Sequence, residues 1–166
     1  MAITKIQSES LNLADTYDFT GTVTGAGESN TPLFSAYKPS VQADLSPNQY
    51  NKITFTTEEF DPSSVYDATN SKFVAPSAGK YFFNTLVRVD PDVVGPTGMS
   101  LSFFKNGSLV RYNRQYNEDT QSCEIQMMIN LAQNDYVEVY LYYHDDNHDV
   151  MGDTNNSIFQ GFKVST

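Results

Sequence analysis

Cysteine is nearly absent from this chain, since Cys123 is the only one among 166 residues. A single thiol excludes an internal disulfide framework. Cys123 alternates with Ile125 and Met127, and this pattern predicts a buried thiol on the inner face of a strand. No activating base lies near it in the sequence, so we do not expect a catalytic cysteine.

Long apolar runs are also missing. No stretch approaches the length of a transmembrane helix, so we expect no membrane insertion. The first ten residues, MAITKIQSES, lack the apolar core of a secretory leader, so we expect no signal peptide.

Basic side chains are scarce. The chain has 10 Lys and Arg against 20 Asp and Glu, which gives a formal net charge of −10. Such a chain repels phosphate groups, so we exclude DNA and RNA as partners. The same charge favours solubility and can attract divalent cations.

Catalytic patterns are missing as well. No serine lies in a Gly-x-Ser-x-Gly turn, and the glycines of residues 24–27 (TGAG) are not followed by the lysine of a phosphate-binding loop. Two carboxylate pairs, Glu58 with Glu59 and Glu118 with Asp119, lie in apparent turns where both acids should be ionised. We therefore expect a protein that is not an enzyme, with no catalytic residue and no bound cofactor.

The segment 144–156 holds the candidate metal ligands. His144 and His148 have a spacing that suits zinc on a helix, but the acids and Asn147 between and beside them predict a turn, so we expect no zinc site. Calcium prefers several oxygen ligands, and a solvated acidic loop is the favoured alternative because the spacing does not match an EF-hand. The weak calcium candidates are Asp145, Asp146, Asp149 and Asp153.

Aromatic side chains are abundant: the chain has 11 Tyr and 11 Phe but no Trp. Extended runs with period-2 alternation recur from residue 31 onward, and Asn106-Gly107 between two of them predicts a tight hairpin. The run 80–89 predicts a long buried strand with two faces, one with Tyr81, Phe83, Thr85, Val87 and Val89 and the other with Phe82, Asn84, Leu86 and Arg88. No amphipathic helix is visible. Many short antiparallel strands predict an all-β sandwich, most simply a jelly roll. The predicted strands are 33–37, 52–57, 72–74, 80–89, 100–105, 108–116, 122–131, 136–144 and 157–164.

The first 30 residues differ from the rest. They are polar with sparse apolar side chains, and only residues 17–23 alternate like a short strand. A segment of this kind buries little by itself, so we expect an attachment arm at 1–30 and a head at 31–166. The candidate attachment residues are Leu11, Leu13, Tyr17, Phe19 and Val23.

Several aromatic side chains are left over once the core faces are assigned. If Val137 and its alternating neighbours face the core, the tyrosines of run 136–143 face away from it. Such a set predicts a contact between subunits or with a ligand, whereas cation–π packing is the alternative for the two tyrosines around Arg114. The candidate ligand or interface residues are Tyr112, Arg114, Tyr116, Tyr140, Tyr142 and Phe104.

Six short motifs occur in a familiar order. They are LFSAY, YNKITF, Tyr66-Asp67 followed by SKFVAPSAGKYFF, SLSFFKNGS, NDYVEV and SIFQGFKV. Together they resemble the complement C1q/TNF-like globular head over residues 33–164. The resemblance implies a jelly roll that assembles as a homotrimer. Heads of this type can hold calcium near the trimer axis, but no ligand set matches residue by residue.

The N-terminal segment has its own resemblance. Residues 3–27, including SLNLADTYDFTGTVTGAG, are similar to the opening of tail-fibre and other structural proteins of marine tailed bacteriophages. Our leading hypothesis is therefore a bacteriophage virion surface protein made in the host cytoplasm. Its arm would bind other virion proteins, and its trimeric head would decorate the capsid or form a short tail-fibre tip that touches a host glycan. The alternative is a free trimeric C1q-like module of lectin type, with calcium or a glycan as ligand. A polysaccharide hydrolase is the least supported class.

Overall fold

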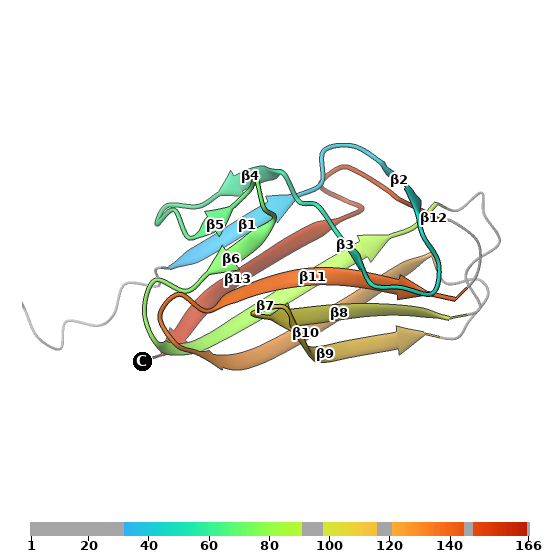
Figure 1. Cartoon of the computed structure of the whole chain (residues 1–166). Coiled ribbons are helices and arrows are strands. Elements are labelled where there is room, and N and C mark those ends of the chain that lie inside the picture. Colours follow the sequence, from blue (N-terminus) through green and yellow to red (C-terminus); the bar gives the residue numbers. More distant parts are fainter. Residues whose placement is uncertain (1–31, 91–97, 116–120, 145–147, 166) are drawn as a thin grey trace, which may run out of the picture.

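The computed structural model describes residues 32–90, 98–115, 121–144 and 148–165. These residues form an all-β sandwich, in which long strands run along the two layers (Figure 1). This confirms the predicted fold class. Within the described ranges, no helix has the length and hydropathy needed to cross a membrane. The proposed arm at 1–30 lies outside the described residues, with its attachment candidates Leu11, Leu13, Tyr17, Phe19 and Val23.

The sandwich has two main antiparallel sheets. The first sheet has the order β10 (Ser122–Leu131), β7 (Gly79–Arg88), β13 (Ile158–Ser165), β1 (Leu33–Tyr37) and β4 (Thr57–Phe60). The second sheet has the order β5 (Tyr66–Asp67), β6 (Lys72–Val74), β11 (Tyr136–Tyr143), β8 (Met99–Lys105) and β9 (Ser108–Gln115), and β3 (Asn51–Lys52) also pairs with β11. A small sheet joins β2 (Gln42–Leu45) and β12 (His148–Val150).

The core lies between the two main sheets. Of the two faces of residues 81–89, the one with Tyr81, Phe83, Thr85, Val87 and Val89 points inward, and all five side chains are 0% exposed. Phe34 stacks on Tyr66 and Phe73, with ring centroids 4.8 and 5.4 Å apart. Cys123 is buried as predicted, and its burial raises the pKa of the thiol, so it stays protonated and unreactive near neutral pH.

The Asn106-Gly107 hairpin joins β8 to β9 as predicted. Both residues have positive φ, 50° and 76°, as a two-residue hairpin turn of the primed type requires. Asn106 also fixes the next turn, because its amide nitrogen donates to Asp135 Oδ1 at 2.7 Å and its Oδ1 accepts from the Tyr136 backbone at 2.9 Å. Lys105 adds an ion pair to Asp135 at 2.7 Å.

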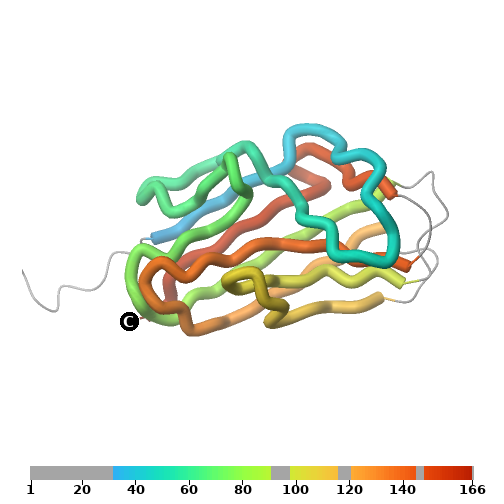
Figure 2. Tube along the Cα trace, viewed as in Figure 1, coloured from blue at the N-terminus to red at the C-terminus, as the bar shows by residue number. Residues whose placement is uncertain are grey.

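One predicted strand was wrong in its extent. Residues 52–57 do not form a single strand: β3 ends at Lys52 and β4 begins at Thr57. The reason is that β3 pairs with β11 in the second sheet whereas β4 pairs with β1 in the first, so residues 53–56 cross between the layers (Figure 2). The predicted alternation still holds, since Ile53 and Phe55 are both 0% exposed.

Two predicted loops also contain strands. β2 lies within the predicted loop after residue 37, and β12 lies within the polar segment 145–156. They pair with each other, with His148 opposite Leu45. The hydroxyl of Tyr143 donates to the Leu45 carbonyl and accepts from the His148 amide, so a buried side chain holds this pair in place. β5 is likewise a short strand inside a predicted loop.

Gly161 in β13 shows why the closing motif contains a glycine. A Cβ at this position would overlap the ring of Phe83 and lie 2.8 Å from the Phe82 carbonyl oxygen. The glycine therefore lets β13 pack closely against β7 over the aromatic core.

Candidate binding faces

The outer face of the first sheet carries an apolar row that crosses four strands. Met128 on β10 pairs with Phe82 on β7, Phe82 pairs with Phe162 on β13, and Phe162 pairs with Leu33 on β1. Met128 is 60% exposed and Phe162 is 44% exposed. We call these four residues the apolar row. Leu33 and Phe82 are half-buried, so the row leaves apolar surface in water whose burial would be favourable.

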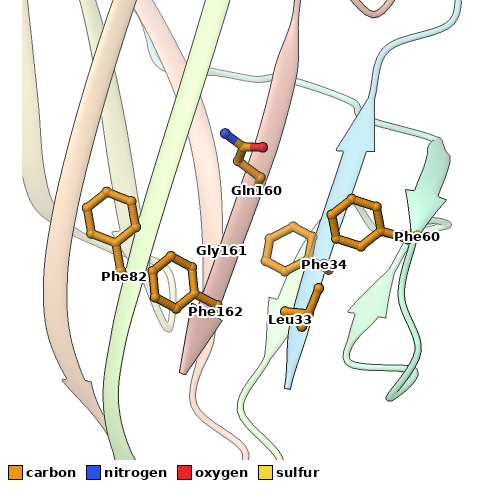
Figure 3. A pocket seen from close by; sticks show the side chains of 7 residues that line it. All are labelled: Leu33, Phe34, Phe60, Phe82, Gln160, Gly161 and Phe162. Carbon is orange, nitrogen blue, oxygen red and sulfur yellow. The ribbon is translucent and has the colours of Figure 1, made fainter. Parts of the chain in front are cut away.

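A shallow hollow lies at one end of the apolar row. It has a volume of about 340 Å³. The rings of Phe82 and Phe162 are 5.4 Å apart, and Phe60 stands on the far side of β1, where it is 49% exposed (Figure 3). The lining residues are Leu33, Phe34, Phe60, Phe82, Gln160, Gly161 and Phe162. This surface is suited to an apolar side chain rather than to a polar ligand.

Polar side chains border the apolar row. The next register along the sheet places Gln126, Asn84 and Gln160 side by side on β10, β7 and β13. Gln160 donates to the Asn84 side-chain oxygen at 3.4 Å, and Asn84 donates to Glu124 at 2.6 Å. An apolar centre with a polar border is the usual anatomy of a protein interface.

The outer face of the second sheet carries the candidates predicted from the sequence. Tyr140, Ser102 and Tyr112 lie in one register across β11, β8 and β9, and Tyr142, Ser100 and Arg114 lie in the next. The structure thus brings Tyr112, Arg114, Tyr140, Tyr142 and Phe104 to one face. Tyr116 lies outside the described residues.

Four rings on this face form a continuous cluster, and Tyr112 lies in the same register as Tyr140, across β8. Ring centroids are 4.3 Å apart for Phe104 and Tyr140, 5.1 Å for Tyr50 and Phe104, and 5.2 Å for Tyr50 and Tyr142. Tyr50 was missed by the sequence reasoning, because it lies in a polar segment with no alternation. We call Tyr50, Phe104, Tyr112, Tyr140 and Tyr142 the aromatic platform.

An ion pair lies beside the platform. Lys52 Nζ is 2.5 Å from Glu138 Oε1, and the Glu138 residue is only 8% exposed. The Tyr140 hydroxyl lies 3.5 Å from the other Glu138 oxygen. Burial, followed by the nearby Glu138 charge, raises the pKa of Tyr140, so this hydroxyl keeps its proton. Sequence reasoning missed Lys52 and Glu138, because the contact joins residues far apart in the chain.

The predicted metal ligands are separated or already engaged. His144 contacts the ring of Tyr142 on the outer face, whereas His148 is buried against Tyr143. Asp149 Oδ1 accepts from the Asp44 amide at 2.8 Å, and Asp153 accepts from Asn155 and Asn156. In the part of the chain that the structure describes, no group of three or more His, Cys, Asp or Glu side chains could hold a metal ion. Asp145 and Asp146 lie outside that part, so calcium binding stays untested.

The carboxylate pairs offer no catalytic arrangement that the structure describes. The predicted turn at Glu58 and Glu59 was wrong, because both lie in the short edge strand β4, which pairs with β1. Glu59 accepts a hydrogen bond from the Ser35 hydroxyl at 2.7 Å. Glu118 and Asp119 lie outside the described residues.

Two main sheets with this strand order define a jelly roll of the C1q/TNF type. The C1q domain family model matches residues 34–164, and the chain belongs to this family. Domains of this family are typically trimeric binding modules and are generally not enzymes. No match was found among curated protein sequences.

Solved structures share the fold at low identity. The globular domain of zebrafish complement 1qA protein is 16% identical with a TM-score of 0.61, and the match covers 80% of this chain and 97% of that one. Murine APRIL, solved at pH 8.0, is 11% identical with a TM-score of 0.62, covering 80% and 98%. Eiger TNF from S. frugiperda is 10% identical with a TM-score of 0.57, covering 80% and 92%. These likenesses concern the fold alone.

Proposed function

We propose that this chain is a subunit of a homotrimeric, non-enzymatic binding head. The observation that carries the proposal is the apolar row on the outer face of the first sheet. Its four residues occupy adjacent strands, so they form one patch rather than scattered exposed side chains. A second copy of the chain is the occupant that fits, because the family is typically trimeric and the patch has the polar border of an interface.

A trimer built on the apolar row needs a second, different contact surface on each subunit. A threefold ring needs a heterologous contact, in which one surface of a subunit meets a different surface of its neighbour. The face of the first sheet supplies one surface. The edge strand β9 supplies a second exposed apolar surface, with Leu109 and Val110 each 40% exposed. The sequence reasoning placed leftover aromatic residues of β11 between subunits; we now propose the first sheet for that contact.

We propose further that the trimer stands on the surface of a bacteriophage particle, as a capsid decoration or a short tail-fibre tip. Support comes from the resemblance of residues 3–27 to structural proteins of marine tailed phages. In this proposal the arm binds other virion proteins, and the head remains free for recognition. Localisation on the virion follows from the same support.

Mass spectrometry of purified particles of the phage that encodes the chain tests the virion role. The expected result is the chain in the particle, at a copy number divisible by three. Its absence from particles, while it is abundant in infected cells, would overturn the virion role and leave the trimeric head intact.

A free trimeric module of lectin type is the second candidate. The observation in its favour is the aromatic platform, which offers a recognition surface without any need for a particle. The two candidates are separated by the same particle analysis.

A further inference from the structure

We propose that the aromatic platform on the outer face of the second sheet is a binding site for a neutral carbohydrate. The inference rests on the proposed role as a binding head and names its ligand class and site. The platform and the apolar row lie on the outer faces of opposite sheets, so a contact on the row itself does not cover the platform. Of the platform residues, Tyr112 lies on β9, the edge strand that supplies the second proposed contact surface, and the other four rings come from β8, β11 and the residue before β3.

The rings of the platform suit the apolar side of a sugar. Aromatic faces carry partial negative charge, and the C–H groups on one side of a pyranose ring carry partial positive charge, so the two attract when stacked. Tyr112 is 57% exposed and Tyr50 is 42% exposed, which leaves ring surface available. Four of the five rings are tyrosines, whose hydroxyls add hydrogen-bonding groups at the border of each ring.

Small hydroxyl side chains lie between the rings. Ser100 and Ser102 of β8 face outward with exposures of 3% and 0%, and each lies between a tyrosine of β11 and a residue of β9. The Ser102 hydroxyl oxygen is buried and has no hydrogen-bond partner among the described residues. A buried polar group without a partner is unfavourable, and a sugar hydroxyl inserted between Tyr112 and Tyr140 would satisfy it. This serine distinguishes the platform from a plain apolar patch.

A charged pair adds a directional group at the border. Lys52 holds the Glu138 carboxylate, while the second carboxylate oxygen is left with the Tyr140 hydroxyl at 3.5 Å. A carboxylate fixed in this way accepts well from sugar hydroxyls.

The charges of the protein favour a neutral ligand over an acidic one. The Lys52 ammonium is already paired with Glu138, Arg114 is a second basic side chain on this face, and the whole chain carries a net charge of −10. An acidic glycan would therefore be repelled. A protein partner would need a drier surface, and the apolar row on the opposite sheet has that character while the platform alternates rings with hydroxyls.

A glycan array of neutral and sialylated oligosaccharides, probed with the full-length protein, identifies a ligand whose affinity is then measured by calorimetry. We expect neutral glycans to bind, and the Tyr112→Ala and Tyr142→Ala variants to bind at least about tenfold more weakly. Tyr112→Phe should retain most of the affinity because it keeps the ring, and Ser102→Ala should weaken binding without changing the fold. Arg111→Ala is the matched control, since Arg111 neighbours Tyr112 on β9 but pairs with the core residue Phe103.

Light scattering on the same samples keeps the two proposals separate. A trimer that binds no neutral glycan, prefers sialylated ones, or binds equally well in the Tyr112 and Tyr142 variants overturns the carbohydrate inference and leaves the trimer standing. A monomer that binds neutral glycans through these tyrosines supports the carbohydrate inference and contradicts the proposed trimer.

Discussion

Phe82 of β7 and Phe162 of β13 are directly paired across the first sheet, with ring centroids 5.4 Å apart, on the face that points away from the core. Two large rings in this position stay partly in water in a single subunit. Contact with another copy would remove both from water, at roughly 25 cal/mol per Å² of apolar surface.

Replacing one ring of this pair should separate the subunits. We expect Phe162→Asp to give a folded monomer, because it places a charge in the centre of the proposed interface. Tyr50→Asp is the matched control: Tyr50 is 42% exposed against 44% for Phe162, and its ring packs on Phe104 and Tyr142 of the opposite sheet. Light scattering and circular dichroism measure mass and folding together. A Phe162→Asp protein with unchanged mass would contradict the proposed contact.

Gly161 should be intolerant of even one methyl group. In Gly161→Ala the added Cβ meets the Phe83 ring and the Phe82 backbone, neither of which moves freely. We expect destabilisation of about 1–3 kcal/mol, seen as a fall of several degrees in the thermal midpoint. Gly98→Ala is the control, since its Cβ would meet only the exposed His144 side chain. Equal midpoints for the two variants would show that β13 does not pack on Phe83 as described.

Lys38 should make stability depend on pH. It is 4% exposed, its ammonium donates to Thr54 Oγ1 at 3.0 Å, and burial lowers its pKa from 10.5 to about 8. Between pH 8 and 10.5 the unfolded chain therefore holds a proton on Lys38 that the folded chain has lost, so the free energy of unfolding rises with pH. Below pH 8 the full cost of burying the charged ammonium is present. The rise in stability ends near pH 10, because burial raises the pKa of Tyr66 and Tyr143 and unfolding then releases their protons.

Urea unfolding at fixed protein concentration measures this effect. From pH 7.5 to 9.5 the free energy of unfolding should increase by on the order of 1–2 kcal/mol. Lys38→Met should remove the increase and raise stability at pH 7.5, while Thr54 keeps its bond to Gln42 at 3.0 Å. A slope that survives in Lys38→Met would assign the pH dependence to another group.

Asn106 should stabilise two turns at once. Asn106→Ala loses the side-chain bonds to Asp135 and Tyr136 and also strains the backbone, because φ is 50° there. Asn106→Gly loses only the bonds, so the difference between the variants isolates the backbone cost. We expect a loss of about 1–2 kcal/mol for Asn106→Gly and more for Asn106→Ala. The control is Asn130→Ala, an exposed position on β10, which should change stability little. An equal loss there would contradict the role of Asn106.

Local patterns in the sequence predicted the parts of the fold that local physics determines. The alternation of residues 81–89 separated the two faces of the strand, and Asn106-Gly107 marked a turn because few residues accept positive φ. The break at 53–56 was not predictable, since it depends on which strands β3 and β4 pair with. β2 and β12 are too short and polar to give a pattern.

Part of the aromatic platform could be predicted from the sequence. Tyr112, Tyr140 and Tyr142 stood out as aromatic residues left over from the core faces. The positions of Ser100, Ser102 and the Lys52–Glu138 ion pair could not be predicted from the sequence, because they depend on the register of β8 and on the pairing of β3 with β11. The apolar row was missed for the same reason: its four residues come from four separate strands.

The most direct measurement is the solution mass of the full chain by light scattering, over a range of concentrations. We expect a species three times the mass of the 18.6 kDa chain, and we expect it to persist on dilution. A stable species of 18.6 kDa at all concentrations would contradict it, and the apolar row would then need a different occupant.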